Sequence, residues 1–294
     1  MEFRSIVLHL GAHKTGTSLV QKYLRDRGEA CFKAGIFPMP RGDGDKLIGW
    51  GAAATLKAGA GTLRRNIETT ARDGMPYFVL SHENSLGGPL RKDGVGLYPE
   101  AAARGAALKQ ALPDRPQRVI YYIRNQASFI ESYYLQTIHQ GKWHDFKEFM
   151  ADVDLDRLSW VPLYETLCQL FGTENVVIRS FDADIAEGQS AYLRNFLSAA
   201  TAADLTPFGD FDYNPVRNPS IGDRGLELAR HINPVLQGPE RKLFRRFLQD
   251  KFSNQDYPRP KLLTTEDKAA LEARYAEENR ALLIRSAETA RPPL

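Results

Sequence analysis

The sequence predicts an α/β fold in which helices flank a central parallel β-sheet and the C-terminal part is mainly helical. Three observations support this prediction. Short apolar segments alternate along the chain with helical ones, an order typical of parallel strands connected by helices. A glycine loop, Gly11–Ser18, stands between the first apolar segment and the first helical one. Hydrophobic residues make up 43% of the chain and charged residues 26%, the balance of an ordinary globular protein.

Four segments are predicted to be buried strands. Each is short and rich in aliphatic, aromatic or β-branched side chains, a composition that indicates burial on both faces of a sheet. They cover residues 3–10, 77–81, 118–123 and 175–181. Polar residues follow three of them directly: the glycine loop follows the first, His82 and Glu83 the second, and Arg124 the third.

Helices are predicted between and after these strands. The first covers residues 17–28 and places Leu19, Val20, Tyr23 and Leu24 on one face, with Gly28 at its end. The other helices are predicted over residues 62–74, 99–112, 126–140, 145–151, 159–172, 188–200, 222–233, 239–250 and 265–286. Residues 38–61, rich in glycine, are predicted to form a mobile loop or lid. We expect one domain, 1–294, in which residues 205–294 form a mainly helical extension.

Composition excludes several classes of protein. The net charge of +3 is too small to indicate a nucleic-acid-binding protein, although it allows one local basic site. Two cysteines cannot form a disulfide framework or a cysteine-type zinc site. No apolar run approaches the roughly 18 to 20 residues needed to cross a bilayer, and no secretory signal is visible at the N-terminus. We therefore expect a cytoplasmic protein.

The glycine loop is the strongest functional signal. Two glycines with four residues between them, placed between a strand and a helix, allow the backbone to curl so that successive N–H groups point inward. The hydroxyls of Thr15, Thr17 and Ser18 add further hydrogen-bond donors. In an ATPase loop, a lysine directly follows the second glycine. Here Thr17 holds that position and the lysine is Lys14, so the loop is predicted to bind a phosphate-like anion without an obligatory metal.

A second anion-binding segment follows the third predicted strand. Arg124 ends that strand, and Ser132 lies eight residues later in the next helix. Ligands of open α/β sheets bind at the carboxyl ends of the strands, where an arginine can hold two phosphate oxygens. Alone, such an arginine is more often ion-paired or solvated than ligand-bound.

Together the two segments resemble the sulfotransferases that use 3′-phosphoadenosine 5′-phosphosulfate (PAPS), a family with a P-loop-type fold. HLGAHKTGTSLVQKYL resembles the family's 5′-phosphosulfate loop, and YYIRNQASFIESYYLQ resembles its 3′-phosphate segment. The segments SHENSL, FKEFM and ARYAEENRALL resemble the bacterial carbohydrate-type branch. The resemblance spans residues 6 to about 285 and implies sulfonate transfer from PAPS to a hydroxyl, with adenosine 3′,5′-bisphosphate (PAP) as product and no metal.

The resemblance also implies roles for individual residues. Residues of the loop from Lys14 to Ser18, Gly16 included, contact the 5′-phosphosulfate, while Arg124 and Ser132 hold the 3′-phosphate. Arg217 is a weaker candidate for the same phosphate, since the family's Arg-Lys-Gly string is missing. His13 is either a ligand contact or a loop histidine bonded to the protein. Lys14 would also stabilise the charge that develops on the leaving phosphate.

Two adjacent residues are candidates for the general base that takes the acceptor's proton. His82 has an ordinary pKa near 6.5, suited to proton transfer near neutrality, whereas Glu83 would need its pKa raised by burial. Because adjacent residues at a strand end often point to opposite sides, we expect only one of them to face the acceptor. We favour His82, since the family's cytosolic branch has a Thr-His at this place, but Glu83 can replace it.

The acceptor is less clearly specified. Tyr133, Tyr134, Trp143 and His144 can line a sugar site, and residues 40–61 can close over it. The partners implied are the donor nucleotide and a glycan, glycolipid or small alcohol; peripheral membrane contact is open. Two other functions remain open. A P-loop kinase using Mg-ATP would need a lysine at Thr17 and a metal-binding aspartate. A non-catalytic nucleotide-binding module would not need the candidate base.

Overall fold

The computed structural model describes residues 3–40, 60–70, 75–90, 96–213, 215 and 219–293. A five-stranded parallel sheet lies at its centre, in the order β2-β3-β1-β4-β5. The strands are β1 (Ser5–His9), β2 (Ile36–Pro40), β3 (Tyr77–Ser81), β4 (Gln117–Ile123) and β5 (Val176–Ser180). The α/β class with a parallel central sheet flanked by helices is therefore confirmed.

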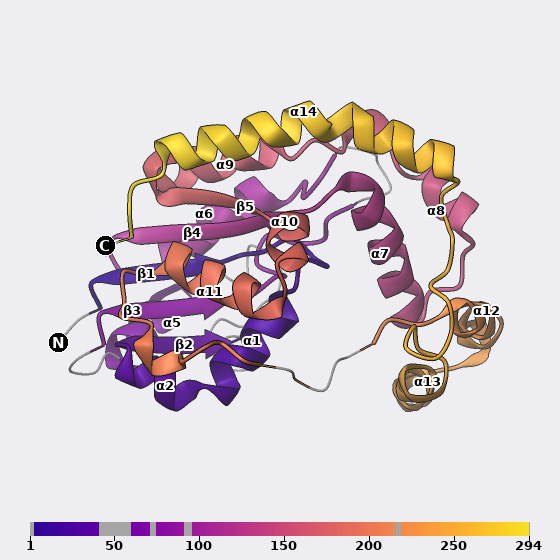
Figure 1. Cartoon of the computed structure of the whole chain (residues 1–294), viewed down its shortest axis with the longest axis horizontal. Helices are drawn as coiled ribbons and strands as arrows, with labels where there is room; N and C mark the ends of the chain where they lie inside the picture. The colour runs from indigo at the N-terminus through magenta and orange to yellow at the C-terminus, as the bar shows by residue number, and fades with distance from the viewer. Residues whose placement is uncertain are drawn as a thin grey trace.

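Helices cover both faces of this sheet, as Figure 1 shows. The described helices before β5 are α1 (Thr17–Asp26), α2 (Gly28–Lys33), α5 (Ala60–Thr70), α6 (Ala101–Ala111), α7 (Gln126–His139), α8 (Phe146–Ala151) and α9 (Val161–Phe171). Those after β5 are α10 (Phe181–Ala186), α11 (Gln189–Ala200), α12 (Asp223–Ile232), α13 (Gly238–Lys251) and α14 (Thr265–Thr289). The predicted helices within residues 99–112, 126–140, 145–151, 159–172 and 188–200, and the three C-terminal ones, are confirmed.

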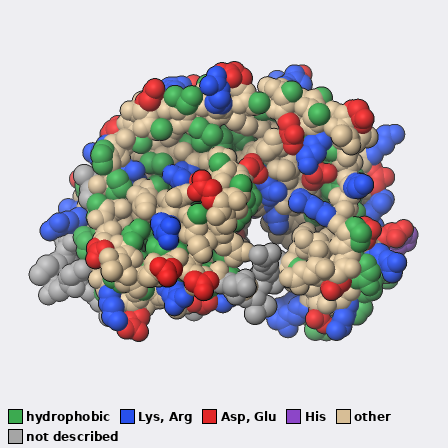
Figure 2. Space-filling view, in the orientation of Figure 1, with side chains coloured by type: hydrophobic (Ala, Val, Ile, Leu, Met, Phe, Trp, Pro, Cys, Tyr) green, Lys and Arg blue, Asp and Glu red, His purple; other side chains and the backbone are tan. Residues whose placement is uncertain are grey.

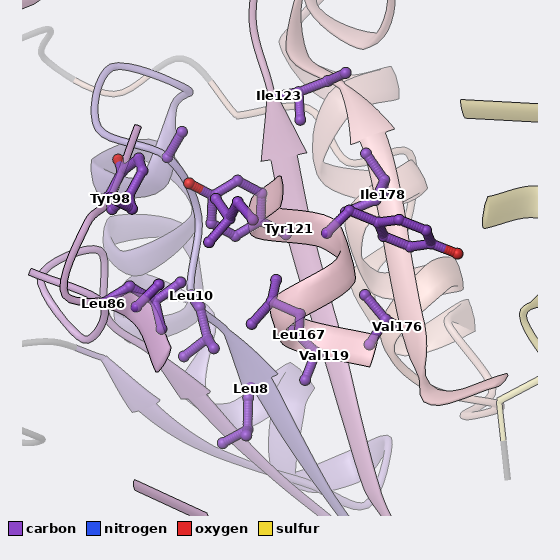
Figure 3. Close-up of a cluster of buried hydrophobic side chains, with 14 of the residues drawn as sticks. Leu8, Leu10, Leu86, Tyr98, Val119, Tyr121, Ile123, Leu167, Val176 and Ile178 are labelled. Atoms are coloured by element: carbon purple, nitrogen blue, oxygen red, sulfur yellow. The ribbon is translucent and has the colours of Figure 1, made fainter. Parts of the chain in front are cut away.

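Alternating strand residues point to two separate cores. Leu8, Val119 and Tyr121 belong to the core beneath α6, α9 and α14, shown in Figure 3. Val7 and Ile120, their neighbours along the strands, belong to the core beneath α1 and α11. This alternation is the two-residue period of a strand, and burial on both faces explains why the segments are continuously apolar.

The C-terminal helix α14 packs along its own chain. Leu271, Tyr275 and Leu282 are buried in the core beneath it, and the Ser286 hydroxyl accepts a hydrogen bond from the Ile178 amide of β5 at 2.8 Å. These contacts agree with the intramolecular packing expected from the sequence. The division into one domain with an extension from residue 205 stays a prediction.

Strand β2 was not predicted. Residues 38–40 were part of the predicted glycine-rich loop, and Pro38 and Pro40 lack the N–H that a central strand needs. The strand lies at the edge of the sheet and pairs only with β3, so one side of its backbone needs no partner in the sheet. The rest of the predicted lid, residues 41–59, lies outside the described residues, and residues 60–61 begin α5.

Two further boundaries differ from the prediction. Gly28 does not lead into a loop: α1 ends at Asp26 and Gly28 is the first residue of α2. Phe181 belongs to α10 rather than to the last strand, because the Ser180 hydroxyl accepts a hydrogen bond from the Ala183 amide and caps a new helix. Neither change moves the carboxyl ends of β3, β1 and β4, which lie side by side in the sheet.

Candidate active site

Three adjacent strands bring the predicted motifs together. The glycine loop follows β1 at the centre, His82 and Glu83 follow β3 on one side, and Arg124 follows β4 on the other. Parallel strands place their carboxyl ends at the same edge of a sheet, where ligands of open α/β folds bind. The sheet order, which the sequence did not specify, therefore gathers these segments at one edge.

The glycine loop has the curled backbone that anion binding needs. Lys14 and Gly16 both adopt left-handed conformations, with φ of 65° and 78°, and α1 begins directly after Gly16. Within the described part of the chain, the amides of residues 14–17 donate to no backbone carbonyl. Unused N–H groups ahead of a helix N-terminus form a concave, partly positive surface for an anion.

Gly16 is required by its surroundings as well as by its φ. A Cβ at this position would lie 3.0 Å from the Tyr192 hydroxyl and 3.1 Å from the Phe181 ring. The same Tyr192 hydroxyl donates a hydrogen bond to the Thr15 carbonyl at 2.8 Å, so it cannot move aside without losing that contact. The loop is thus held against α11 from behind.

Gly16→Ala is expected to destabilise the fold by about 2 to 3 kcal/mol, the sum of a left-handed alanine and local overpacking. Chemical denaturation of both proteins measures the difference in free energy of unfolding. Gly28→Ala is the control, because its φ is not positive and no atom lies within 4 Å of the added methyl group. Equal stabilities for Gly16→Ala and Gly28→Ala would contradict the prediction.

The three predicted hydroxyl residues have different surroundings. The Thr15 hydroxyl donates to the Ala12 carbonyl at 2.7 Å, so it holds the loop's own shape. The Thr17 hydroxyl is buried and has no hydrogen-bond partner in the described structure. Ser18 is exposed. An unsatisfied buried hydroxyl at the start of α1 fits a ligand oxygen that would satisfy it.

His13 is bonded to the protein. Its amide donates to the Tyr98 hydroxyl at 2.7 Å, and its two ring nitrogens lie 2.9 Å from that hydroxyl and 3.0 Å from the Asn84 side-chain oxygen. The ring also stands edge-on to Tyr133, with centroids 6.0 Å apart. His13 therefore connects the glycine loop to the middle of α7, and its contact with a ligand stays a prediction.

Lys14 lies in an unfavourable environment for a cation. The pKa of its ammonium group is lowered from 10.5 to about 8, mainly by burial and to a smaller extent by the charges of Arg124 and Arg259. The pKa of Arg124 is likewise lowered to about 10, mainly by burial, which Asp182 opposes and Arg259 reinforces. Three cations that repel each other at one place are stabilised by an anion between them.

Arg124 lies between the glycine loop and α7. Its guanidinium donates to the Lys14 carbonyl at 2.8 Å and to the Ser128 hydroxyl at 2.9 Å, and lies 3.9 Å from the Asp182 carboxylate. Ser132 is buried one helical turn beyond Ser128 on the same face of α7. Ser128 therefore links the predicted pair: it accepts a hydrogen bond from Arg124 and lies one helical turn before Ser132.

The two candidate bases are not equivalent. The side chain of His82 is completely buried; its Nδ1 lies 3.3 Å from the Ser85 hydroxyl, which donates to the His82 carbonyl at 2.7 Å. Glu83 is half-buried, and its carboxylate accepts a hydrogen bond from the Gln21 side chain of α1 at 2.8 Å. Part of the Glu83 side chain is therefore exposed at the site, whereas His82 has no exposed surface in this structure. Which of the two is the base stays a prediction.

Aromatic side chains line a cavity of about 640 Å³ beside the glycine loop. Tyr133, Trp143 and His144 contribute to it, as predicted, together with Phe149. Tyr134 does not: it is buried in another cluster, and its hydroxyl donates to the His144 carbonyl. Tyr133 also contacts His13, so the cavity adjoins the loop.

Several site residues were missed from the sequence. Ser128 stands four residues from both Arg124 and Ser132, so helical spacing could have identified it. Gln21 stands one turn after Thr17 in α1 and gave no separate signal. Arg259 lies between two prolines, far along the chain, and no local pattern connects it with the loop. Arg217 lies outside the described residues, so its predicted contact stays a prediction.

No group of three or more His, Cys, Asp or Glu side chains suited to holding a metal ion occurs among the described residues. None of the described helices combines the length and apolar character required to cross a bilayer. Cys31 and Cys168 are both free thiols.

The strand, the glycine loop, the helix and the convergent cations define a P-loop-type α/β protein with a site suited to a phosphate-bearing ligand. No protein-family profile matches the chain, and no curated protein matches it. Among solved structures, it is similar to a sulfotransferase from Alicyclobacillus acidocaldarius, at 14% identity and a TM-score of 0.47, covering 97% of each chain. The function proposed next depends on the residues of the site.

Proposed function

We propose that this protein is a sulfotransferase that moves a sulfonate group from PAPS to a hydroxyl of a carbohydrate or glycolipid acceptor, without a metal, in the cytoplasm. The observation that carries the proposal is the glycine loop itself: its amides donate to no described backbone carbonyl, and Arg124 donates to the Lys14 carbonyl at 2.8 Å. The charge of Arg259 also acts on Lys14 and Arg124. Two anionic groups on one nucleotide match this arrangement: a 5′-phosphosulfate over the loop and a 3′-phosphate near Arg124 and Ser132.

The chemistry requires one proton transfer and one stabilised leaving group. PAPS supplies an electrophilic sulfur; the acceptor oxygen forms a bond to it, and the bond from sulfur to the bridging phosphate oxygen breaks, releasing PAP. Glu83 takes the acceptor proton, because it is the candidate base that reaches the surface of the site. Lys14 stabilises the charge on the departing phosphate. His82 packs behind Glu83.

The acceptor is assigned to the aromatic cavity. Sugar rings present apolar C–H faces that pack on aromatic side chains, and their hydroxyls need carboxylate or amide partners. Tyr133, Trp143 and Phe149 offer the first, and Asp152 lines the same cavity. The His13–Tyr133 contact places this cavity next to the loop that would hold the sulfonate.

A kinase activity is disfavoured by the loop itself. Its lysine precedes the second glycine, so Thr17 stands where a kinase loop has the lysine that reaches the terminal phosphates. A non-catalytic module would not need a half-buried carboxylate directly after β3, at the edge of the sheet that carries the glycine loop. Neither alternative accounts for both Lys14 and Glu83.

Calorimetric titration with PAP, and separately with ATP, each with and without Mg²⁺, tests the donor assignment. PAP is expected to bind independently of Mg²⁺. Arg124→Ala is expected to weaken PAP binding roughly tenfold to a hundredfold, the value of a charge-assisted contact to phosphate. Ser132→Ala, which leaves the Arg124 contact with the loop intact, is expected to have a smaller effect in the same direction.

Arg25→Ala is the control for a lost positive charge, since Arg25 is exposed at the end of α1. It is expected to leave the dissociation constant unchanged. Binding of Mg-ATP alone would contradict the proposal in favour of a kinase. Binding of neither nucleotide would contradict it in favour of a module that no longer uses this site.

A further inference from the structure

A second basic site lies at the far end of α7, outside the residues assigned to the donor. Here α13 packs on α7 through Leu248, which shares a buried cluster with Leu135 and Ile138. The side-chain amide of Asn233, in the turn before α13, holds this turn to the end of α7 by donating to the Ile138 and Lys142 carbonyls. Between the end of α7 and the first turns of α13 lies an open cavity of about 460 Å³.

The lining of this cavity is strongly cationic. Arg241, Lys242, Arg245 and Arg246 all contribute to it, and no carboxylate does. Arg241 and Arg245 are four positions apart, and so are Lys242 and Arg246, so both pairs lie on one side of α13. Among the described residues, no ion pair joins Lys242, Arg245 or Arg246 to a carboxylate. Four cations facing one cavity are an unbalanced charge that a ligand can neutralise.

The cavity continues the candidate active site along α7. His139, which lines it, lies two helical turns after Ser132 on the same face of α7. The ring of His139 lies 3.4 Å from the Arg245 carbonyl. Its pKa is lowered to about 4, first by burial, then by the charge of Arg245, with a further contribution from Lys14. Figure 2 shows Lys and Arg side chains around the hollow between the body and α13.

The donor does not account for this charge. Its 5′-phosphosulfate and 3′-phosphate are matched by Lys14, Arg124 and Arg259, so its anionic groups already have partners. We propose that the cavity between α7 and α13 binds an anionic group of the acceptor, a sulfate, phosphate or carboxylate, and that the acceptor is an acidic glycan. This inference rests on the proposed function and specifies the substrate class of the same site.

The geometry of α13 favours a bound ligand over a membrane surface. Its exposed apolar residues, Leu243 and Phe247, lie one turn apart on a different side of the helix from the cations of the cavity. A membrane-binding helix carries its cations on its polar face, where they meet the flat layer of lipid headgroups. Here the cations face a concave space shared with α7, which a lipid surface cannot fill.

The test compares two double variants that lose the same charge. Lys242→Gln with Arg246→Gln removes two cations of the cavity; Lys251→Gln with Lys268→Gln removes two exposed cations elsewhere. Neither pair contains a residue assigned to the donor or to catalysis. Calorimetry measures the binding of PAP, and then, with PAP present, of a sulfated hexasaccharide and of the uncharged hexasaccharide with the same backbone.

The cavity variant is expected to bind PAP within a factor of two of the original protein and the sulfated hexasaccharide roughly tenfold more weakly, the value of one or two solvated charge contacts. The control variant is expected to bind both normally. Loss of PAP affinity in the cavity variant would overturn the inference by assigning the cations to the donor.

Three other results would also overturn it. The first is equal affinity of the original protein for the charged and uncharged hexasaccharides. The second is no measurable affinity for the sulfated one. The third concerns vesicles that contain phosphatidylserine. If the cavity variant lost binding to these vesicles but bound the sulfated hexasaccharide normally, α13 would be assigned to a membrane. PAP binding by the original protein tests the proposed function separately. Failure of the inference about the acceptor can therefore be distinguished from failure of the proposed function.

Discussion

Lys14→Gly is expected to abolish sulfonate transfer while making the protein more stable. The backbone of Lys14 is left-handed, with φ of 65°, a conformation that costs a residue with a side chain about 1 kcal/mol and glycine little. The lysine residue is also half-buried. Burial, together with the charges of Arg124 and Arg259, lowers the pKa of its ammonium group to about 8. Glycine removes the strained conformation and the repulsion together.

The cost to activity has the opposite sign. Without the ammonium group, the charge on the departing phosphate loses its nearest cation, a change worth about a hundredfold to a thousandfold in turnover. PAP release from PAPS, with an acceptor found by screening, measures turnover; calorimetric unfolding measures the melting temperature. Lys22→Ala is the control, since Lys22 is exposed in α1 and pairs with Asp26. A Lys14→Gly protein that is both less stable and fully active would contradict the prediction.

The pH dependence of PAP binding gives a second readout of Lys14. The pKa of the free protein's lysine, about 8, lies below its value of 10.5 in the unfolded chain. The unfolded chain therefore binds more protons between these values, and the stability of the ligand-free protein rises with pH there. Affinity for PAP changes in the other direction, falling as pH rises through about 8, because the anion binds the protonated form. Lys14→Arg is expected to remove this fall, which titrations from pH 7 to 9.5 measure.

The sequence predicted those parts of the site whose signal is local. A strand, a Gly-x4-Gly loop and a helix are contiguous, so residues 6–24 identified the loop and its hydroxyls. The Arg124–Ser132 spacing was likewise readable, because both residues belong to one strand–helix connection. Strand β2 was missed because its prolines contradict a strand except at an edge, and edge position is a property of the whole sheet.

Other parts of the site depend on the tertiary structure. The charge of Arg259 acts on Lys14 and Arg124, although more than a hundred residues separate Arg259 from either along the chain. Nothing in the sequence around Arg259 distinguishes it from a surface arginine. The sequence favoured His82 over Glu83 only through the family resemblance, since both residues follow the same strand. Their burial separates them: His82 lies against Ser85 inside the protein, while Glu83 reaches the site beside Gln21.

Glu83→Gln is expected to lower kcat by about a hundredfold to ten-thousandfold, the usual contribution of a general base. Glutamine has the same shape, and its side-chain oxygen can still accept the hydrogen bond from Gln21. The affinity for PAP is therefore expected to stay within about threefold. Loss of the base also removes its protonation from the pH–rate profile, so the decrease of kcat at acidic pH should disappear in this variant.

His82→Asn supplies the matched comparison. Because His82 is buried and its ring contacts Ser85, the substitution is expected to destabilise the protein by about 1 to 3 kcal/mol and to leave kcat within about tenfold. Both variants are compared by turnover at saturating PAPS and by chemical denaturation. The opposite pattern, in which Glu83→Gln remains active and His82→Asn loses turnover with unchanged stability, would make His82 the base. It would require the ring to leave its buried position when acceptor binds, because a histidine with no exposed surface cannot reach the proton that it must take.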